Sequence, residues 1–469
     1  MYRDLEPLPL PRELGASDAP GLLDIGGTAP DLNRSIDLSA LAHLLFFSAG
    51  ITKQIDHGGH DMYFRAAACT GALYHIELYI VCCDVPGLTA GVYHFAANDF
   101  SLRRLRDGDH RGVVAEATGD SSVVRSPATI VMTSTYWRNS WKYQVRAYRH
   151  AYWDSGTILA NFLAVAAAQR IPARVLGGFA DEPINNLLDL DTDKEVSLAL
   201  VPVGDGAAPP EATQGLGPLD FETMPLSHHE VDYPAIRAMH EASSLTSAAE
   251  AIAWRGASGE SVARAPEGRL VQLEPDVDEA LDGDPVERVI LRRGSSRRFS
   301  REPISYRQLS NAIHWATRAI PADFLDPSGN GLNRLYLIVH AVDGLPAGAY
   351  VFHRDQDSLE LLKEGDFRNT GGYLGLEQEL PADAAVDVFF LSDLEVALGR
   401  FGNRGYRAAQ LEAAIMGGRL YLAAYGQGFG ASGLTFYDDE VTDFFSPHAA
   451  GKSVMFLVAL GVPFKRKRS

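Results

Sequence analysis

The sequence predicts an α+β fold that is built twice within one chain. Three pairs of matching segments carry this prediction, because a long internal repeat decides the architecture before any other feature. The pairs are GLTAGVYHF (87–95) with GLPAGAYVF (344–352), the gapless pair 157–182 and 415–440, and LALVPVG (198–204) with MFLVALGVP (455–463). A repeat of this length indicates two homologous domains and not a solenoid.

Each repeat is predicted to contain the same elements in the same order. It opens with a helix, at 36–51 and at 304–320, and continues with the strands LYIVCC and LYLIVH, which are β-branched and aromatic. The gapless pair then indicates a long Ala- and Leu-rich helix, a short loop, a strand and an acidic Asp-Glu turn. The segments 198–204 and 455–463 are the closing strands.

Domain boundaries follow from the repeat. We expect an N-terminal domain over residues 1–225, a helical linker over 226–284 and a C-terminal domain over 285–469. Within the linker, 232–255 has the pattern of one helix, and GASGESVARAPEG (256–268) is typical of a loop. The two apolar central helices are expected to pack on each other, which would make the chain a pseudo-twofold dimer.

Composition excludes several classes of protein. The 469 residues are 46% apolar and 22% charged, as in an ordinary globular protein. A net charge of −18 argues against nucleic acid as a partner, although the chain closes on the basic KRKRS. No apolar run suggests a membrane span or signal peptide, so no membrane partner is expected. Three cysteines form neither a disulfide framework nor a zinc pattern, which suits the cytoplasm and predicts no metal.

One repeated segment differs between the copies in its titratable groups. WKYQVRAYR (141–149) corresponds to GRFGNRGYR (399–407), and both end in Arg-x-Tyr-Arg. The pair Lys142-Tyr143 has become Arg400-Phe401 in the second copy. Lys and Tyr are candidates for proton transfer, whereas Arg and Phe are not.

A basic segment opens the C-terminal domain. In RRGSSRRF (292–299), Arg293 and Arg297 stand two positions either side of Ser295, so an extended backbone would point their side chains the same way. Forked, permanently charged guanidinium groups suit phosphate. The alternative interpretation is a solvated basic loop.

These segments resemble the FMN-dependent nitroreductase superfamily, in particular its SagB-type branch of azoline dehydrogenases. RRGSSRRF resembles the Arg-x-Ser-x-Arg motif that opens the family domain. ACTGALYHIELY (68–79) resembles the branch's Pro-Ser-x-Gly-Ala-Leu-Tyr-Pro-x-Glu-x-Tyr segment, the 87–95 and 344–352 segments resemble the hairpin that follows, and the segment from Trp141 resembles the branch's Lys-Tyr motif. The resemblance implies a mixed sheet flanked by helices, with FMN bound at a dimer interface.

The resemblance also implies how the two halves would share the cofactor. The C-terminal half has the FMN-clamping residues Arg293, Ser295, Arg297, Ser432 and Gly433, whereas LNRSIDLS (32–39) and PARV (172–175) replace those motifs in the N-terminal half. The N-terminal half has Cys69, Thr70, Gly71 and the Lys-Tyr pair, whereas the C-terminal half has DPSGNGLN (326–333) and Arg400-Phe401. Because the losses are complementary, we expect one FMN per chain in a composite site.

The activity that the resemblance implies is oxidation of thiazoline or oxazoline rings to azoles in a ribosomally made peptide. Hydride would pass to flavin N5, with Lys142 or Tyr143 as base and the other residue orienting it. Free Lys and Tyr side chains titrate near pH ~10, so the neighbouring cations Arg146 and Arg149 would help to lower that value.

Three residues depart from the branch pattern: Ala68 replaces Pro, Cys69 replaces Ser and His75 replaces Pro. His75 is either a further titratable group or a hydrogen-bonded strand residue. The adjacent pair Cys82-Cys83 is expected in the core.

Two other functions fit the sequence. One is a generic NAD(P)H-dependent reductase of nitro compounds or quinones. The other is an inactive scaffold that supports a partner cyclase, and a cyclase is also the expected partner of an active enzyme. The peptide, the azole type, the electron acceptor and further association of chains stay open.

Overall fold

The computed structural model describes residues 2, 4–18, 20–27, 34–56, 58–59, 61–210, 216–219, 221, 227–257, 265–277, 283–326 and 331–464. Four segments discussed above lie partly or wholly outside this range: residues 32–33 of LNRSIDLS, residues 226, 258–264 and 278–282 of the linker, 327–330 of DPSGNGLN, and the KRKRS end. Within the described residues, no helix is long and apolar enough to cross a membrane.

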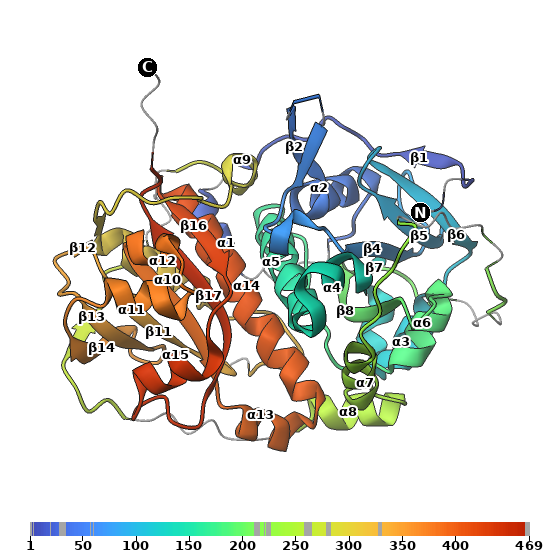
Figure 1. The fold of residues 1–469 in the computed structure, drawn as a ribbon. Coiled ribbons are helices and arrows are strands. Elements are labelled where there is room, and N and C mark those ends of the chain that lie inside the picture. Colours follow the sequence, from blue (N-terminus) through green and yellow to red (C-terminus); the bar gives the residue numbers. More distant parts are fainter. Residues whose placement is uncertain are drawn as a thin grey trace. The chain divides into compact units, whose positions relative to one another are not determined.

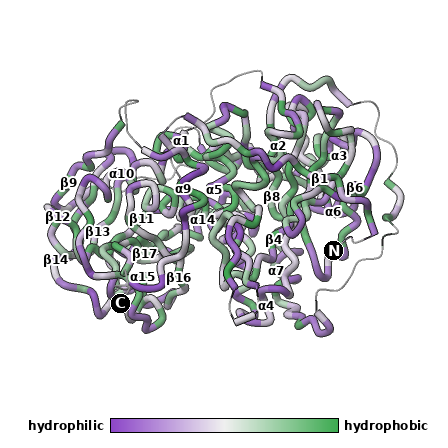
Figure 2. Tube along the Cα trace, turned by 90° about the horizontal axis from the view of Figure 1, so that it is seen from above, coloured by the Kyte–Doolittle hydropathy of each residue, from purple (hydrophilic) through white to green (hydrophobic). Residues whose placement is uncertain are grey.

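The chain divides into two compact units, each with its own sheet (Figure 1). Unit 1 comprises residues 1–16, 28–258 and 321–324, and unit 2 comprises 17–27, 259–320 and 325–469. Residues 227–257 of the expected linker thus belong to unit 1. Hydrophobic stretches run through the interior of each unit, and hydrophilic ones are more frequent in its outer loops (Figure 2).

Unit 1 contains a six-stranded sheet in the order β1-β6-β5-β4-β7-β8, with antiparallel neighbours throughout. The strands are β1 Pro7–Pro9, β4 Ile76–Cys82, β5 Gly91–Ala96, β6 Ser101–Asp107, β7 Ala128–Thr135 and β8 Glu195–Val203. A separate hairpin pairs β2 Ile51–Asp56 with β3 Asp61–Arg65. The unit's helices are α2 Leu38–Ala49, α3 Arg111–Thr118, α4 Trp137–Tyr143, α5 Ala147–Ala168, α6 Asp181–Leu188, α7 Pro234–Ala242 and α8 Ala248–Arg255, with 3-10 turns η1 Thr70–Ala72, η2 Ser121–Arg125 and η3 Gln144–Arg146.

Unit 2 repeats this order with additions. Its seven-stranded sheet runs β16-β17-β15-β11-β13-β14-β9, again antiparallel, and a two-residue parallel ladder joins β10 to β12. The strands are β9 Leu270–Gln272, β10 Ile304–Ser305, β11 Asn333–Val339, β12 Val342–Asp343, β13 Gly348–His353, β14 Ser358–Glu364, β15 Val386–Ser392, β16 Gly430–Leu434 and β17 Ser453–Gly461. The helices are α1 Gly21–Gly26, α9 Val286–Arg292, α10 Tyr306–Ala316, α11 Arg368–Leu374, α12 Glu379–Asp383, α13 Leu394–Phe401, α14 Arg404–Gly426 and α15 Asp438–Phe445.

The predicted duplication is confirmed by the strand order. The series β6-β5-β4-β7-β8 in unit 1 has the same connectivity as β14-β13-β11-β15-β17 in unit 2. The central helices α5 and α14 span 22 and 23 residues, and nearly every residue in both is buried. The Asp-Glu turns form the first turns of α6 and α15, where the positive end of the helix dipole stabilises carboxylates.

Two local expectations were wrong. The stretch 232–255 forms two helices and not one, because Ser243 and Ser244 bond back to carbonyls at the end of α7 and Ser247 caps α8 by accepting from Glu250 N. The strand expected after α5 is reduced to isolated bridges at Ala173, Val175 and Leu176.

Each half of the sequence contributes one short segment to the other unit. Residues 17–27, which include α1, belong to unit 2, where Gly21 lies against the Val286 backbone. Residues 321–324 belong to unit 1, where the Asp323 carboxylate accepts from Gly177 N at 2.7 Å and Gly178 N at 3.0 Å. The repeat did not predict this exchange.

Candidate functional site

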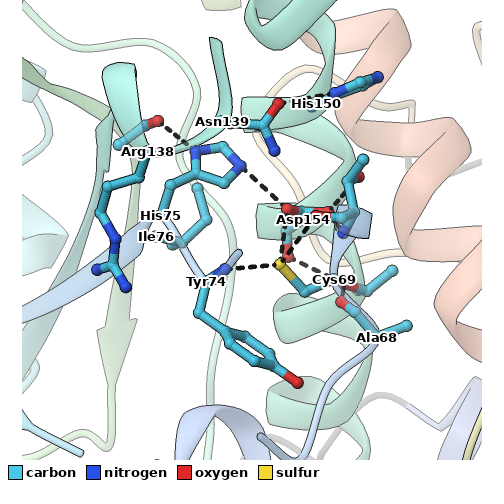
Figure 3. Close-up of polar contacts among 12 residues, drawn as sticks. Ala68, Cys69, Tyr74, His75, Ile76, Arg138, Asn139, His150 and Asp154 are labelled. Carbon is cyan, nitrogen blue, oxygen red and sulfur yellow. Dashed lines mark hydrogen bonds and ion pairs between the residues drawn. The ribbon is translucent and has the colours of Figure 1, made fainter. Parts of the chain in front are cut away.

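The loop before β4 is held by a buried carboxylate on α5 (Figure 3). Asp154 is 3% exposed and accepts from Thr70 N and Oγ1 at 2.8 Å, from the Cys69 thiol at 3.0 Å, and from His75 Nε2 at 2.9 Å. Burial alone would raise the pKa of Asp154, but the hydrogen bond and charge of His75, with those from the loop, lower it. The carboxylate is therefore ionised and fixes Cys69 and Thr70 in place.

His75 belongs to this support. Its ring is fully buried, with Nδ1 2.8 Å from Ser134 Oγ and Nε2 bonded to Asp154. Both ring nitrogens are engaged, so the structure favours the interpretation of a hydrogen-bonded structural residue, although His75 lies in the loop directly before β4 and not in the strand. Burial, followed by the charge of Asp154, raises the pKa of the Cys69 thiol, which is therefore protonated.

The Lys-Tyr pair at the end of α4 lies against the same loop. A Cβ built on Gly71 would stand 2.6 Å from the Tyr143 hydroxyl oxygen and 3.4 Å from Lys142 Nζ. Lys142 Nζ lies 5.2 Å from the centre of the Tyr143 ring, and the lysine side chain is exposed. Two motifs that are about 70 residues apart in sequence thus meet within unit 1. Gly71 itself has φ 62°, a conformation that glycine adopts without strain.

A buried imidazole, which the sequence analysis did not single out, packs against Tyr143. The rings of His150 and Tyr143 meet edge to face with centroids 4.8 Å apart, and His150 Nδ1 lies 2.9 Å from Asn139 Oδ1. Burial lowers the pKa of His150 to about 3, and the cations Arg149 and Arg146 add to this effect. The imidazole of His150 is therefore neutral.

Helix α4 is anchored to the sheet by an ion pair. Arg138 Nη1 lies 3.0 Å from Glu77 Oε1 on β4, and His94 Nε2 lies 3.2 Å from Glu77 Oε2. Burial would raise the pKa of Glu77, but His94, Arg65 and Arg138 lower it to about 2. Glu77 is the Glu of the ACTGALYHIELY segment. Its position in that motif is the sequence feature from which its part in the site could have been predicted.

Unusual backbone conformations gather in the two loops. Ala72, Tyr74 and Gln144 have positive φ values of 54°, 49° and 53° without being glycine. Such strained residues concentrate at functional sites, where the surrounding structure holds them in place. This clustering supports the assignment of 68–75 and 142–144 as a functional region.

In unit 2, Tyr421 on α14 connects three of the predicted FMN-clamping residues. Its hydroxyl lies 3.3 Å from Ser295 Oγ and accepts a hydrogen bond from Gly433 N, and its ring centre is 5.9 Å from Arg293 Cζ. Ser296 N donates to Ala431 O at 2.9 Å, which holds the segment against β16. Sequence reasoning missed Tyr421, although Leu163 replaces it in the first copy.

The remaining predicted residues of unit 2 lie in the same region. Ser432 is buried within β16, next to Gly433, whereas Ser295 and Arg297 are exposed and Arg293 is half-buried. Among the residues that the structure describes, Arg297 forms no ion pair. The segment thus presents cationic and hydroxyl groups to solvent, as an anion site requires.

The counterparts of these residues make packing contacts and an ion pair within their own units. In unit 1, Arg174 pairs with Asp120 at 2.6 Å and Val175 bridges to Ala322. In unit 2, the Arg400 guanidinium stacks 4.4 Å above the ring of Phe401, which is 3% exposed. The cation-on-ring arrangement of the Lys-Tyr pair is retained there without a titratable group.

Metal chemistry has no candidate within the described ranges, where no group of three or more His, Cys, Asp and Glu side chains could hold an ion. The predicted core position of Cys82 is confirmed, since its side chain is fully buried, while Cys83 is half-buried.

Comparison with known proteins identifies the family. The sequence matches the profile of the Nitroreductase family at residues 88–205 and 290–462, which make up more than half of the chain. A provisionally named nitroreductase of Methanocaldococcus jannaschii is 28% identical over 171 residues, which is 36% of this chain and 81% of that protein.

Solved structures extend the likeness to both units. The crystal structure of a provisionally named nitroreductase from Anabaena variabilis is 26% identical, has a TM-score of 0.75 and covers 98% of this chain and 95% of its own. A chain of the Escherichia coli microcin synthetase McbBCD complex is 22% identical with a TM-score of 0.33, covers 37% of this chain and 66% of its own, and carries no information about activity here. On the sequence profile and on the fold, this chain belongs to the nitroreductase family.

Proposed function

We propose that this chain is an FMN-dependent dehydrogenase of the SagB type, which oxidises thiazoline or oxazoline rings of a modified peptide to azoles. The observation that carries the proposal is that Lys142 and Tyr143 lie against Gly71. A Cβ built on Gly71 would stand 3.4 Å from Lys142 Nζ and 2.6 Å from the Tyr143 hydroxyl oxygen. Both segments belong to the resemblance to the SagB branch. Their proximity in unit 1 supports a common role.

The residues of unit 2 fit FMN. Arg293 and Arg297 provide charge for the phosphate and Ser295 provides a hydroxyl donor. At Gly433 a Cβ would stand 3.1 Å from Phe456 Cζ, so a side chain at this position would crowd the phenylalanine ring. When bound, FMN would supply the hydride acceptor.

The proposal includes one FMN per chain. It is supported by what each copy has lost: Arg174 and Val175 occupy the positions of Ser432 and Gly433, and Arg400-Phe401 occupy those of Lys142-Tyr143. Each of these replacements is engaged in packing or ion pairs of its own unit.

Proton removal from the azoline ring carbon falls to Lys142 or Tyr143. Lys142 Nζ lies 5.2 Å from the centre of the Tyr143 ring, so either group, as a neutral amine or as a phenolate, would be placed to take the proton while the other orients it. His150 is buried and neutral beneath Tyr143, and we assign it the positioning of that ring. The Asp154 carboxylate holds the opposing loop and takes no part in proton transfer.

A visible spectrum of the purified protein with flavin counted per chain tests the cofactor. One FMN per chain is expected. Two would contradict the single site, and a colourless protein that refuses added FMN would contradict the enzyme and indicate a scaffold for a partner cyclase.

Two variants test the base. Lys142→Ala and Tyr143→Phe should bind FMN as the unaltered protein does and lose turnover of a thiazoline-containing peptide by about 10²–10⁴-fold, the range of general-base catalysis. Full activity in both variants would remove the assignment. Arg400→Ala is the matched control and should leave turnover unchanged.

A second candidate is supported by the family profile itself. A nitroreductase-family chain can act as a generic NAD(P)H-dependent reductase of nitro compounds or quinones. Rapid bleaching of the flavin by NAD(P)H alone, without any azoline turnover, would favour this function over the first. Co-purification with a cyclase would favour the first.

A further inference from the structure

The residue directly after the Lys-Tyr pair has a backbone conformation that glycine prefers. Gln144 ends α4 with φ 53° and ψ −139°. This combination is essentially confined to glycine, and a residue with a Cβ is strained in it. Its amide N–H is bonded to Ser140 O, so the helix end holds the strained residue in place.

The second copy shows that the loop needs no side chain here. Gly402 stands at the same place after Arg400-Phe401, with φ 58° and ψ −160°. The conformation is therefore shared by both copies, and only the copy with Lys142-Tyr143 carries a side chain at this position. A residue kept against backbone strain indicates that its side chain is used.

The Gln144 side chain is available for binding. It is exposed, and its amide has no hydrogen-bond partner among the residues that the structure describes. The neighbours Trp141 and Val145 are 55% and 52% exposed, which is high for large apolar side chains. The second copy has Gly399 and Asn403 at these two places. Three differences between the copies thus add recognition groups around one Lys-Tyr pair.

We infer that Gln144 is a specificity-determining residue that binds a backbone amide of the peptide next to the azoline ring, an inference that rests on the proposed function. A primary amide offers both a donor and an acceptor, which matches the N–H and C=O of a peptide. Trp141 and Val145 provide apolar surface for the side chains that flank the ring. A nitro compound or quinone has no peptide N–H to donate.

The variant Gln144→Gly separates recognition from structure. It removes the amide and relieves the strain, so it should fold and raise Tm by about 2–4 °C. The probe is a fluorescein-labelled peptide with one thiazole ring and two residues on each side, and its Kd is measured by fluorescence polarisation. Loss of one hydrogen bond should weaken binding about 5- to 10-fold. The control Gly402→Gln should lower Tm and leave Kd unchanged.

A second peptide makes the test specific for the amide. N-methylation of the amides that flank the thiazole should weaken binding to the unaltered protein by a similar factor and have no further effect on Gln144→Gly. Equal Kd values for the unaltered protein and Gln144→Gly, or additive losses, would overturn the inference. Absence of turnover of the matching thiazoline peptide, with the Kd difference intact, would overturn the proposed activity and leave amide recognition standing.

Discussion

The contact between Gly71 and Tyr143 makes a quantitative prediction for Gly71→Ala. The new methyl group would stand 2.6 Å from the Tyr143 hydroxyl oxygen, whereas ordinary contact begins at 3.4 Å. One of the two groups must therefore move by about 0.8 Å. Tyr143 is half-buried at the end of a helix, so the phenol and not the Asp154-held loop is expected to move.

The displacement should reduce catalysis far more than stability. An alanine at φ 62° is strained by about 1–2 kcal/mol, and this should be the whole loss in the free energy of unfolding. A misplacement of about 1 Å in a catalytic constellation reduces turnover by about 10²-fold. We therefore expect kcat for a thiazoline peptide to fall by about one to two orders of magnitude, with FMN content unchanged.

Gly108→Ala is the matched control. Gly108 has φ 88°, and a Cβ there would meet nothing within 4 Å. Urea unfolding should show similar losses for both variants, while initial rates of thiazole formation should fall only for Gly71→Ala. Equal kcat values for the two variants would refute a catalytic role for the placement of Tyr143.

Three further predictions concern supporting residues. The pKa of Glu77 is lowered from 4.5 to about 2 in the folded state. The stability that this shift contributes, about 3 kcal/mol, is therefore present above pH ~4.5 and lost as pH falls toward 2. Urea unfolding of Glu77→Gln should show a smaller loss of stability over this acidic range than the unaltered protein does. Asp323→Ala leaves two glycine N–H groups of unit 1 without their acceptor and should lower the free energy of unfolding by about 2–4 kcal/mol in the same assay, whereas an unchanged midpoint would show that water replaces the carboxylate. Tyr421→Phe should weaken FMN binding about 5-fold or more in a flavin-release titration, while Tyr425→Phe, which loses only a 3.4 Å contact to Ser296, should have a smaller effect.

The fold could be predicted from sequence because it is encoded twice. Two copies with the same strand order restrict the possible folds, and the gapless pair 157–182 and 415–440 predicted both central helices, although the helices begin earlier, at Ala147 and Arg404. The comparison also directed attention to Lys142-Tyr143, since it showed where the copies differ. Local errors arose where side chains interrupt a helical pattern, as Ser243 and Ser247 do between α7 and α8.

The support around the site could not be predicted in the same way. Asp154 bonds to Thr70 across 84 residues, and Arg138 pairs with Glu77 across 61, so neither contact leaves a local pattern. Tyr421 and His150 lie within helices whose composition predicts only burial. The sequence predicts which residues would carry the chemistry, whereas the residues that hold them in place depend on how the elements pack.

The exchange of short segments gives the chain an unusual connectivity. The backbone passes between the units at 16/17, 27/28, 258/259, 320/321 and 324/325, five crossings where two domains joined by a linker would have one. A single protease cut within 256–268 would therefore leave each fragment carrying a piece that the other unit needs, such as Asp323 for Gly177 and Gly178. Fragments produced in this way should stay associated until they are denatured, and neither half expressed alone should form a complete unit. Cutting the gene once between the repeats, with one new stop codon and one new start codon, therefore cannot produce two proteins that fold independently.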